Sequence, residues 1–187
     1  MRFRLTLSVA VLLLLSRPAQ GDMNNCALML SPLEHDYGAL SRDRQTFIST
    51  PQGKVAALSE RRSNLSVTCL TPQHIALRFS GDRQADGSFR FGAKGMLRVT
   101  IHDAVLDGNS MLLTKTKQQG IATGDTTAAS HSLRAADEIA VGSSSTVQGN
   151  NLNVTLTVTP YLAESAFTVS DTDLQEEIIH IELLDTY

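Results

Sequence analysis

The chain has 187 residues, a formal net charge of −3, no tryptophan and an aromatic content of only 5%. The weak negative charge gives no basic face for nucleic acid or an anionic membrane, so neither partner is expected. The scarcity of aromatic rings argues against an open platform of stacked indoles that would bind carbohydrate.

The first 21 residues are typical of a secretory signal peptide. Arg2 and Arg4 supply positive charge, residues 5–15 are apolar, and Ala19-Gln20-Gly21 is a small-x-small cleavage site. The apolar run is shorter than the roughly 20 residues that span a bilayer, and no cysteine directly follows the cleavage site to carry a lipid anchor. We therefore expect residues 1–21 to be removed and residues 22–187 to be exported as one soluble domain.

Cys26 and Cys69 are the only cysteines, and in an exported chain they most simply form one disulfide. Closing the loop between them would stabilise the fold by about 4 kcal/mol in the chain-entropy description. The alternatives are a free reactive pair or a metal site. Neither has support, because there is no CxxC spacing and no histidine near either cysteine at ligand separation.

Before residue 61 the pattern is weak. Gly38 after Asp36-Tyr37 predicts a tight backbone position with the tyrosine packed beside a strand, and Phe47-Ile48 predicts a short strand. Residues 55–58 fit a strand or a helix equally well. Two alternating runs follow, residues 65–69 and residues 75–79, and we expect a turn between them at Thr71-Pro72.

The next segment has the features of an antiparallel meander. Phe89 and Phe91 share one face of a short strand, residues 97–101 form a clear alternating strand, and Asp107-Gly108 is a hairpin turn signal. Residues 111–113 would begin the returning strand.

From residue 120 to residue 151 the chain is rich in Gly, Ser, Thr and Ala. We expect loops and weak edge strands there, with one helical turn at residues 135–138, or alternatively two short hairpins. Residues 152–158 alternate well and should end at Pro160, and a further short strand should start at residues 167–169.

The C-terminal segment places Ile179, Ile181 and Leu183 on one face, and Tyr187 has the same parity. It is either an ordinary final strand or a strand with a special binding role. Short strands separated by Gly and Pro, with no long helical-period segment, predict an all-β antiparallel sandwich.

No pattern points to an enzyme. The sequence lacks GxSxG, and its histidines form no HxH or HExxH pair. A phosphate loop is excluded near Lys94, because Lys94 does not directly follow Gly92 and no Ser or Thr follows the lysine. We expect no catalytic residues, no metal ligands and no cofactor.

The mature chain resembles fimbrial-like proteins of Gram-negative bacteria, more narrowly an uncharacterised pilin-like family of exported single domains. The resemblance is strongest from Cys26 to Gly108 and covers most of the mature chain loosely. The residues that carry it are Cys26, Asp36, Tyr37, Gly38, Ala39 and Leu40, residues 65–69 with Cys69, Pro72, residues 75–77, Asp82, Arg83, Phe89, Phe91, Gly92, Gly95, Asp107 and Gly108.

The resemblance implies an immunoglobulin-like, pilin-like sandwich assembled by the chaperone–usher route. Such a sandwich lacks its last strand, which a periplasmic chaperone lends and a neighbouring subunit later replaces by strand addition to an open edge. The partners would be the chaperone, an outer-membrane usher, other fimbrial subunits and an unidentified host or surface ligand for cell adhesion. The protein would pass through the periplasm to the fimbrium at the cell surface. The groove would be lined by Ile179, Ile181, Leu183 and Tyr187.

The sequence departs from the pilin pattern at both ends. Tyr187 is terminal rather than penultimate, and residues 171–174 lack the glycine expected about fourteen residues from the end. After cleavage only residues 22–25 would precede Cys26, too few to donate a strand, which predicts a subunit at a fibre end, the tip. Two alternatives are a self-complete exported sandwich that binds a partner without polymerising, and a secreted hydrolase whose catalytic groups converge from distant strands.

Overall fold

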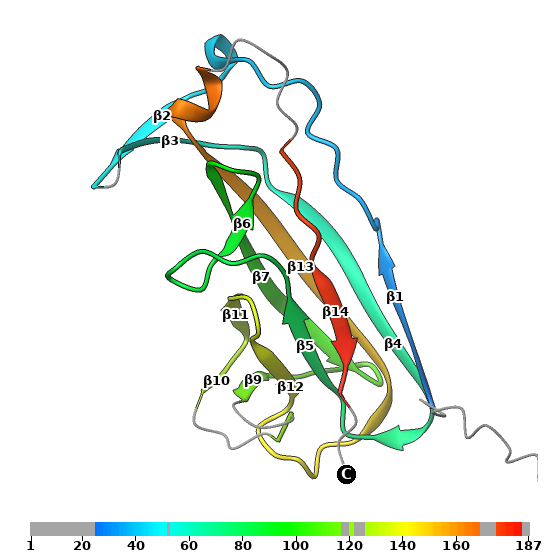
Figure 1. Ribbon diagram of the computed structural model, residues 1–187. Coiled ribbons are helices and arrows are strands. Elements are labelled where there is room, and N and C mark those ends of the chain that lie inside the picture. Colours follow the sequence, from blue (N-terminus) through cyan, green and yellow to red (C-terminus); the bar gives the residue numbers. More distant parts are fainter. Residues whose placement is uncertain (1–24, 52, 117–119, 122–125, 169–174, 185–187) are drawn as a thin grey trace, which may run out of the picture.

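A computed structural model describes residues 25–51, 53–116, 120–121, 126–168 and 175–184. These residues form two antiparallel sheets packed as a sandwich, with two short 3-10 helices, η1 (Arg42–Arg44) and η2 (Glu164–Phe167), and no α-helix among them (Figure 1). The prediction of an all-β fold with antiparallel sheets packed as a sandwich is confirmed.

The first sheet is centred on the long strand β13. One side of β13 pairs with β4 and then β3, and the other side pairs with β7. Outside these, β1 pairs with β4 and β2 with β3, while β6, β8 and β11 pair with the far side of β7. The strands of this sheet are β1 (Cys26–Ser31), β2 (Phe47–Thr50), β3 (Gly53–Ala57), β4 (Arg61–Gln73), β6 (Phe89–Phe91), β7 (Gly95–Leu106), β8 (Asn109–Ser110), β11 (Ser130–Leu133) and β13 (Gly149–Ala163).

The second sheet has the order β10-β9-β12-β5-β14. Its strands are β5 (Ala76–Ser80), β9 (Leu113–Thr116), β10 (Thr127–Ala128), β12 (Glu138–Val141) and β14 (His180–Leu183). The chain therefore enters this sheet by β5, leaves it, and returns to it last through β14.

The core lies between the sheets and follows the alternation in the sequence. In β4, Leu65, Val67 and Cys69 are buried while their neighbours face outward, as predicted. Leu77 and Phe79 of β5 contribute the opposite layer at 1% and 0% exposure. Alternating side chains on strands that face each other across the sandwich thus build one continuous apolar cluster.

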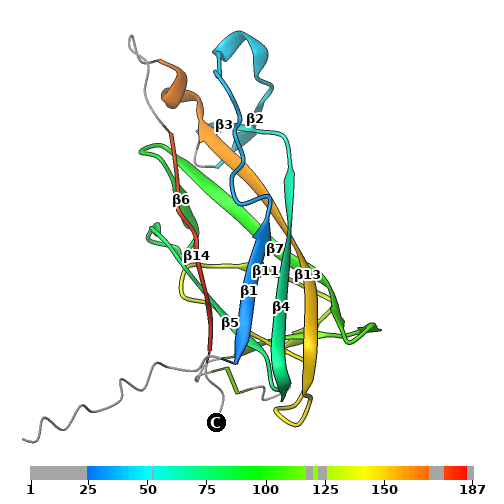
Figure 2. The same cartoon turned by 90° about the vertical axis from the view of Figure 1, so that its right-hand side faces the viewer.

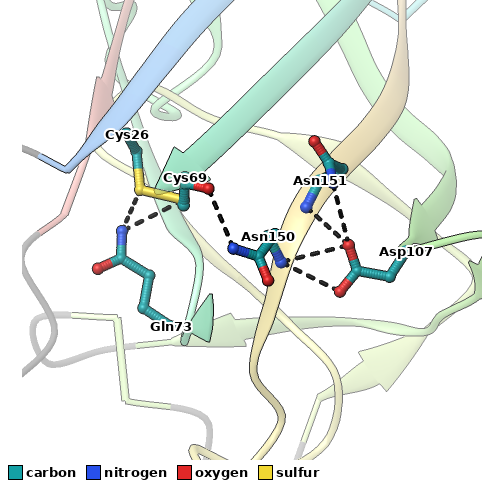
Figure 3. Close-up of a disulfide and its surroundings, with 6 residues drawn as sticks. All are labelled: Cys26, Cys69, Gln73, Asp107, Asn150 and Asn151. Carbon is teal, nitrogen blue, oxygen red and sulfur yellow. Dashed lines mark hydrogen bonds between the residues drawn. A yellow bond between two sulfur atoms is a disulfide. The ribbon is translucent and has the colours of Figure 1, made fainter. Parts of the chain in front are cut away.

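The predicted disulfide between Cys26 and Cys69 is present, and it joins directly paired residues of β1 and β4 (Figure 3). Asn150 donates a side-chain hydrogen bond to the carbonyl of Cys69 at 3.0 Å. The Asp107 carboxylate accepts the backbone N–H groups of Asn150 and Asn151, and these bonds lower the pKa of Asp107. The disulfide end of β4 is thereby connected to the register shift in β13 and to the turn after β7.

The hairpin turn at Asp107-Gly108 is confirmed. Both residues have positive φ, 49° and 82°, as a tight two-residue hairpin requires. The returning strand expected at residues 111–113 is wrong as stated. The returning strand is β8, and the contact with β7 ends at Met111, whose N–H donates to the carbonyl of Ala104. The chain then crosses to the second sheet, where Leu113 begins β9.

Two prolines do not end strands where the sequence suggested. β4 continues through Thr71-Pro72 to Gln73, so the expected turn is absent there. Leu70 donates its N–H to the carbonyl of Asn25, the residue before β1, and Pro72 therefore lies beyond the part of β4 that pairs with β1. β13 likewise continues through Pro160 to Ala163. The carbonyl of Pro160 accepts from Leu58, in the break between β3 and β4, so the missing N–H interrupts no ladder.

Three further expectations for the second half are wrong. Residues 135–138 form no helical turn: Ala136 has φ 76° and donates to the carbonyl of Phe79, and Glu138 already begins β12. Short strands do occupy residues 120–151, but β12 is an interior strand with three buried residues rather than an edge. Phe167 ends η2 instead of starting a strand, and residue 169 lies outside the described residues.

Candidate strand-binding groove

The two sheets end on the same side of the sandwich. In the part of the chain that the structure describes, β1 is the last strand of its sheet and pairs only with β4, and β14 is the last of the other sheet and pairs only with β5. Figures 1 and 2 show β1 and β14 as neighbours that run in opposite directions. The sandwich therefore presents two strand edges to one face.

The main-chain groups of these edges point outward at alternate residues. Leu184 donates to the carbonyl of Ala76, so the even-numbered residues of the last strand pair with β5 and Ile181 turns its N–H and C=O away. By the same argument, the bond from Leu70 to Asn25 leaves Leu28 and Leu30 with main-chain groups that face away from β4. Such rows of groups are templates for a further strand.

Between the edges lies a groove of about 1210 Å³. Its floor is the core itself, and both sheets contribute to it: Phe79 from β5, Val99 from β7 and Leu156 from β13. Ile179 and Ile181 line one side, and Leu30 lines the other. The groove is therefore apolar along the stretch that lies between β1 and β14.

Beyond β1, the segment of residues 33–42 forms one rim of the groove. Ser63, buried at 5% exposure, donates to the carbonyl of Pro32 and accepts from the Nε2–H of His35, both at 2.8 Å. Burial, together with the charge of Arg61, lowers the pKa of His35 and favours its neutral form. These bonds hold the rim against β4.

The Asp36-Tyr37-Gly38 motif is the centre of this rim. The Asp36 carboxylate accepts the N–H of Gly38 at 2.7 Å, and Gly38 has φ 64°, which closes the tight position predicted from the sequence. The Tyr37 ring packs edge-on against Phe91, with centroids 6.4 Å apart, and Arg61 lies 5.6 Å from the ring centroid. The motif therefore anchors the rim to β6.

The Tyr37 hydroxyl is buried and has no hydrogen-bond partner among the described residues. Burial raises the pKa of Tyr37, an effect that the nearby charge of Arg61 only partly offsets. A buried hydroxyl without a partner carries a desolvation penalty. The ring of Tyr37 thus contributes packing, while its oxygen contributes no bond that the structure shows.

The opposite rim is the segment of residues 175–179, which precedes β14. Glu176 accepts the N–H of Gly92 through its backbone carbonyl at 3.2 Å, and Glu177 accepts the N–H of Asp82 through its carboxylate at 2.8 Å. Gly92 has φ 55°, and a Cβ there would meet the Gln175 side chain. Asp82 and Gly92 therefore hold this rim in place through their backbone N–H groups.

Four acidic residues lie on the two segments that form the rims of the groove. Glu34 and Asp36 lie on the first rim, and Glu176 and Glu177 lie on the second. Arg42 is the one arginine or lysine among the residues that line the groove, and it is already paired with Glu164. Burial, reinforced by Asp82, raises the pKa of Glu177 although it also accepts a backbone hydrogen bond. Arg90 and His180 lie close enough to Glu177 for their charges to act against this rise.

The structure brings together six of the site residues predicted from the sequence, and two of these, Ile179 and Ile181, are among the four predicted to line the groove. Ile179 and Ile181 line the groove with Asp36, Tyr37, Gly38 and Phe91. Leu183 packs against the core without lining the groove, and Arg83 forms an isolated bridge to Phe89 outside it. Cys26 and Cys69 are structural, and Tyr187 lies outside the described residues.

Several groove residues had no signal in the sequence. His35 and Ser63 are 28 positions apart and meet only across the β1–β4 pair. Phe167 reaches the groove from η2 and packs against Phe47, with ring centroids 5.5 Å apart. The structure also exposes two apolar residues at the rims that the sequence pattern did not single out, Leu33 at 84% and Ile178 at 68%.

Among the residues described, no group of three or more His, Cys, Asp or Glu side chains is arranged to hold a metal ion, and none of the helices there is long and apolar enough to cross a membrane. Comparison with models of protein families found no match to this chain, and a search of curated proteins found none either.

Proposed function

We propose that this chain is a structural or adhesive subunit of a surface fibre of the chaperone–usher type. It would complete its immunoglobulin-like sandwich with a strand taken from another polypeptide, first a periplasmic chaperone and then a neighbouring subunit. The single observation that carries the proposal is the apolar groove between the unpaired edges of β1 and β14.

The geometry suits a β-strand better than a compact ligand. An extended segment laid between β1 and β14 would meet outward-facing main-chain groups of Leu28 and Leu30 on one side and Ile181 on the other. Its alternate side chains would then contact Phe79 and Leu156 on the floor. Main-chain bonds would supply affinity and the floor would select apolar residues, which is how strand addition works.

The sequence supports the same function by independent features. A secretory signal pattern in residues 1–21 fits passage through the periplasm, and a disulfide fits an oxidising compartment. If cleavage follows Gly21, the short segment before Cys26 favours a subunit that accepts a strand without donating one, at the fibre tip. Mass determination of the mature N-terminus tests that position.

The test is periplasmic expression of the mature chain with and without a chaperone of this class, followed by mass determination and urea unfolding of the soluble product. We expect recovery as a one-to-one complex with the chaperone, and loss to aggregates without it, because an open apolar edge promotes association. A stable monomer that unfolds cooperatively alone would contradict the proposal and support a self-complete exported binding module.

A further inference from the structure

His74 is the one buried histidine in the part of the chain that the structure describes. It is 7% exposed, lies in the connection between β4 and β5, and does not line the groove. Its Nδ1 is 3.0 Å from the carbonyl oxygen of Val147, in the connection between β12 and β13. Its Nε2 is 3.2 Å from the carbonyl oxygen of Gly120, in the connection between β9 and β10. The ring therefore joins three connections that are far apart in the sequence.

The two carbonyl partners fix how many protons the ring needs. A carbonyl oxygen only accepts hydrogen bonds, so each of the two contacts requires an N–H on the imidazole. A neutral imidazole has one N–H, and its other nitrogen presents a lone pair. In the neutral form, one carbonyl oxygen would face that lone pair inside the protein and lose its donor. The imidazolium form has two N–H groups and satisfies both carbonyls.

A carboxylate close to the ring favours the same form. Glu138 of β12 accepts the N–H of Gly120 at 2.9 Å, while the carbonyl of Gly120 accepts from His74. Glu138 and the imidazole thus bond to the two main-chain groups of one glycine. Burial opposes any charge, and the carboxylate and the two carbonyl oxygens act against that cost.

The cations on the surrounding strands are held by carboxylates. Arg78 of β5 bonds to Glu138 at 2.7 Å and lies 3.7 Å from Glu182 of β14. Lys115 of β9 bonds to Asp137 at 2.7 Å. The loop of residues 142–148, which contains Val147, has no charged residue. These elements therefore bring no unpaired cation of their own against the ring among the residues described.

We propose that His74 carries both ring protons in the folded chain and acts as a proton-dependent link between the β4–β5, β9–β10 and β12–β13 connections. Loss of one proton removes the donor to Val147 or to Gly120 and releases that connection from the ring. The link is independent of the proposed function, because none of these three residues lines the groove.

The experiment is nuclear magnetic resonance of the mature chain with isotope-labelled histidine rings and carbonyl carbons, from about pH 6 to about pH 9. The chain is used alone or as its chaperone complex, whichever form is soluble. At about pH 7.5 an imidazole in water is mostly neutral. We expect both ring nitrogens of His74 to give N–H signals at that pH. One bare nitrogen on this ring would overturn the proposal.

His131 is the matched control. It is half-buried, and the structure places its Nε2 2.8 Å from one carbonyl oxygen, that of Leu113. A single carbonyl needs a single N–H, so His131 should show one N–H and one bare nitrogen at about pH 7.5. The comparison separates the effect of two facing carbonyls from that of burial alone.

Substitution assigns the signals. His74→Gln should remove the ring that carries two N–H groups. If that variant does not fold, glutamine is placed at each of the other histidines in turn, and the signal that survives every substitution belongs to His74. These four histidines are His35, His102, His131 and His180.

The pH series tests the link itself. As pH rises, one N–H signal of His74 should be lost, and the carbonyl signal of Gly120 or of Val147 should shift with the same midpoint. A ring that loses its proton while both carbonyl signals stay unchanged would overturn the link. Either result leaves the strand-accepting groove to its own test, because the groove experiment does not involve these residues.

Discussion

Tyr37 shows how one side chain can support a site and still carry a cost. Its ring joins the groove rim to Phe91, but its buried hydroxyl has no partner in the described structure. We expect Tyr37→Phe to raise the free energy of unfolding by about 1 kcal/mol, because the packing is kept and the desolvation penalty is removed. Urea unfolding of the variant and of the parent chain, each purified as its complex with the chaperone, measures this change.

Tyr161→Phe is the control for that substitution. Tyr161 is a partly exposed residue of β13, does not line the groove, and has Arg98 4.9 Å from its ring centroid. Loss of its hydroxyl should change stability by less than about 0.5 kcal/mol. A clear destabilisation by Tyr37→Phe would mean that the hydroxyl has a bonding partner, contrary to the structure.

Glu138 makes stability depend on pH. Burial alone would raise its pKa, but hydrogen bonds from Arg78 and from the N–H of Gly120 outweigh burial and lower it. A lowered pKa stabilises the fold above the pKa of the unfolded chain, about 4.3, and the contribution disappears as pH falls through the folded value. Glu138→Gln should therefore cost about 1 kcal/mol at pH 7 and progressively less below about pH 4.

Glu182→Gln separates this effect from general loss of charge near Arg78. Glu182 approaches the same guanidinium at 3.7 Å, but its side chain is 58% exposed. Exposed pairs contribute little, so we expect a change below about 0.5 kcal/mol at every pH. A cost for Glu138→Gln that is constant across pH would contradict the assignment. The measurement is urea unfolding of both variants, each purified as its complex with the chaperone, over a pH series.

Among the elements, β1 depends most on a covalent constraint. It is a six-residue edge strand, and the disulfide fixes its first residue opposite Cys69 across a sequence separation of 43. Replacing both cysteines by serine should lower the free energy of unfolding by about 2–4 kcal/mol. Hydrogen exchange should show lost protection in β1 while β13, paired on both sides, remains protected. Unchanged exchange in β1 would show that its pairing with β4 suffices.

The sequence predicted an element correctly where neighbouring residues alone determine its structure. The alternation of residues 65–69 and the Asp107-Gly108 turn depend on neighbours along the chain, and both are confirmed. Pro72 and Pro160 are harmless only because of where other strands stop. The sequence around β12 predicts a weak edge strand, whereas the structure pairs β12 with β9 on one side and β5 on the other. The groove combines residues from both ends of the chain, so no local pattern could reveal its rims.

For the molecule as a whole, the decisive feature is that both sheets end at the groove. In the proposed function, the edges of β1 and β14 and the apolar floor between them accept one more strand. An unfilled groove also exposes the core to other copies of the chain, so solubility and completion of the fold should be coupled.

That coupling predicts the behaviour of a self-complemented chain. A flexible linker after residue 187, followed by a strand of alternate valines with lysines at one end, should fill the groove within one molecule. Partial burial of three or four valines should add roughly 3 kcal/mol after the strand is ordered. For a domain of this size that corresponds to a rise in Tm of about 6–12 °C, together with a monomer in gel filtration.

The matched control carries the same linker and lysines but serine in place of each valine. It keeps the charge and the main-chain bonding capacity and removes the contacts with Phe79 and Leu156. If the groove accepts a strand, the valine chain is monomeric and more stable, and the serine chain behaves like the unextended protein. Equal Tm values for all three chains would mean that the sandwich is already complete, because a filled groove has no place for the added strand.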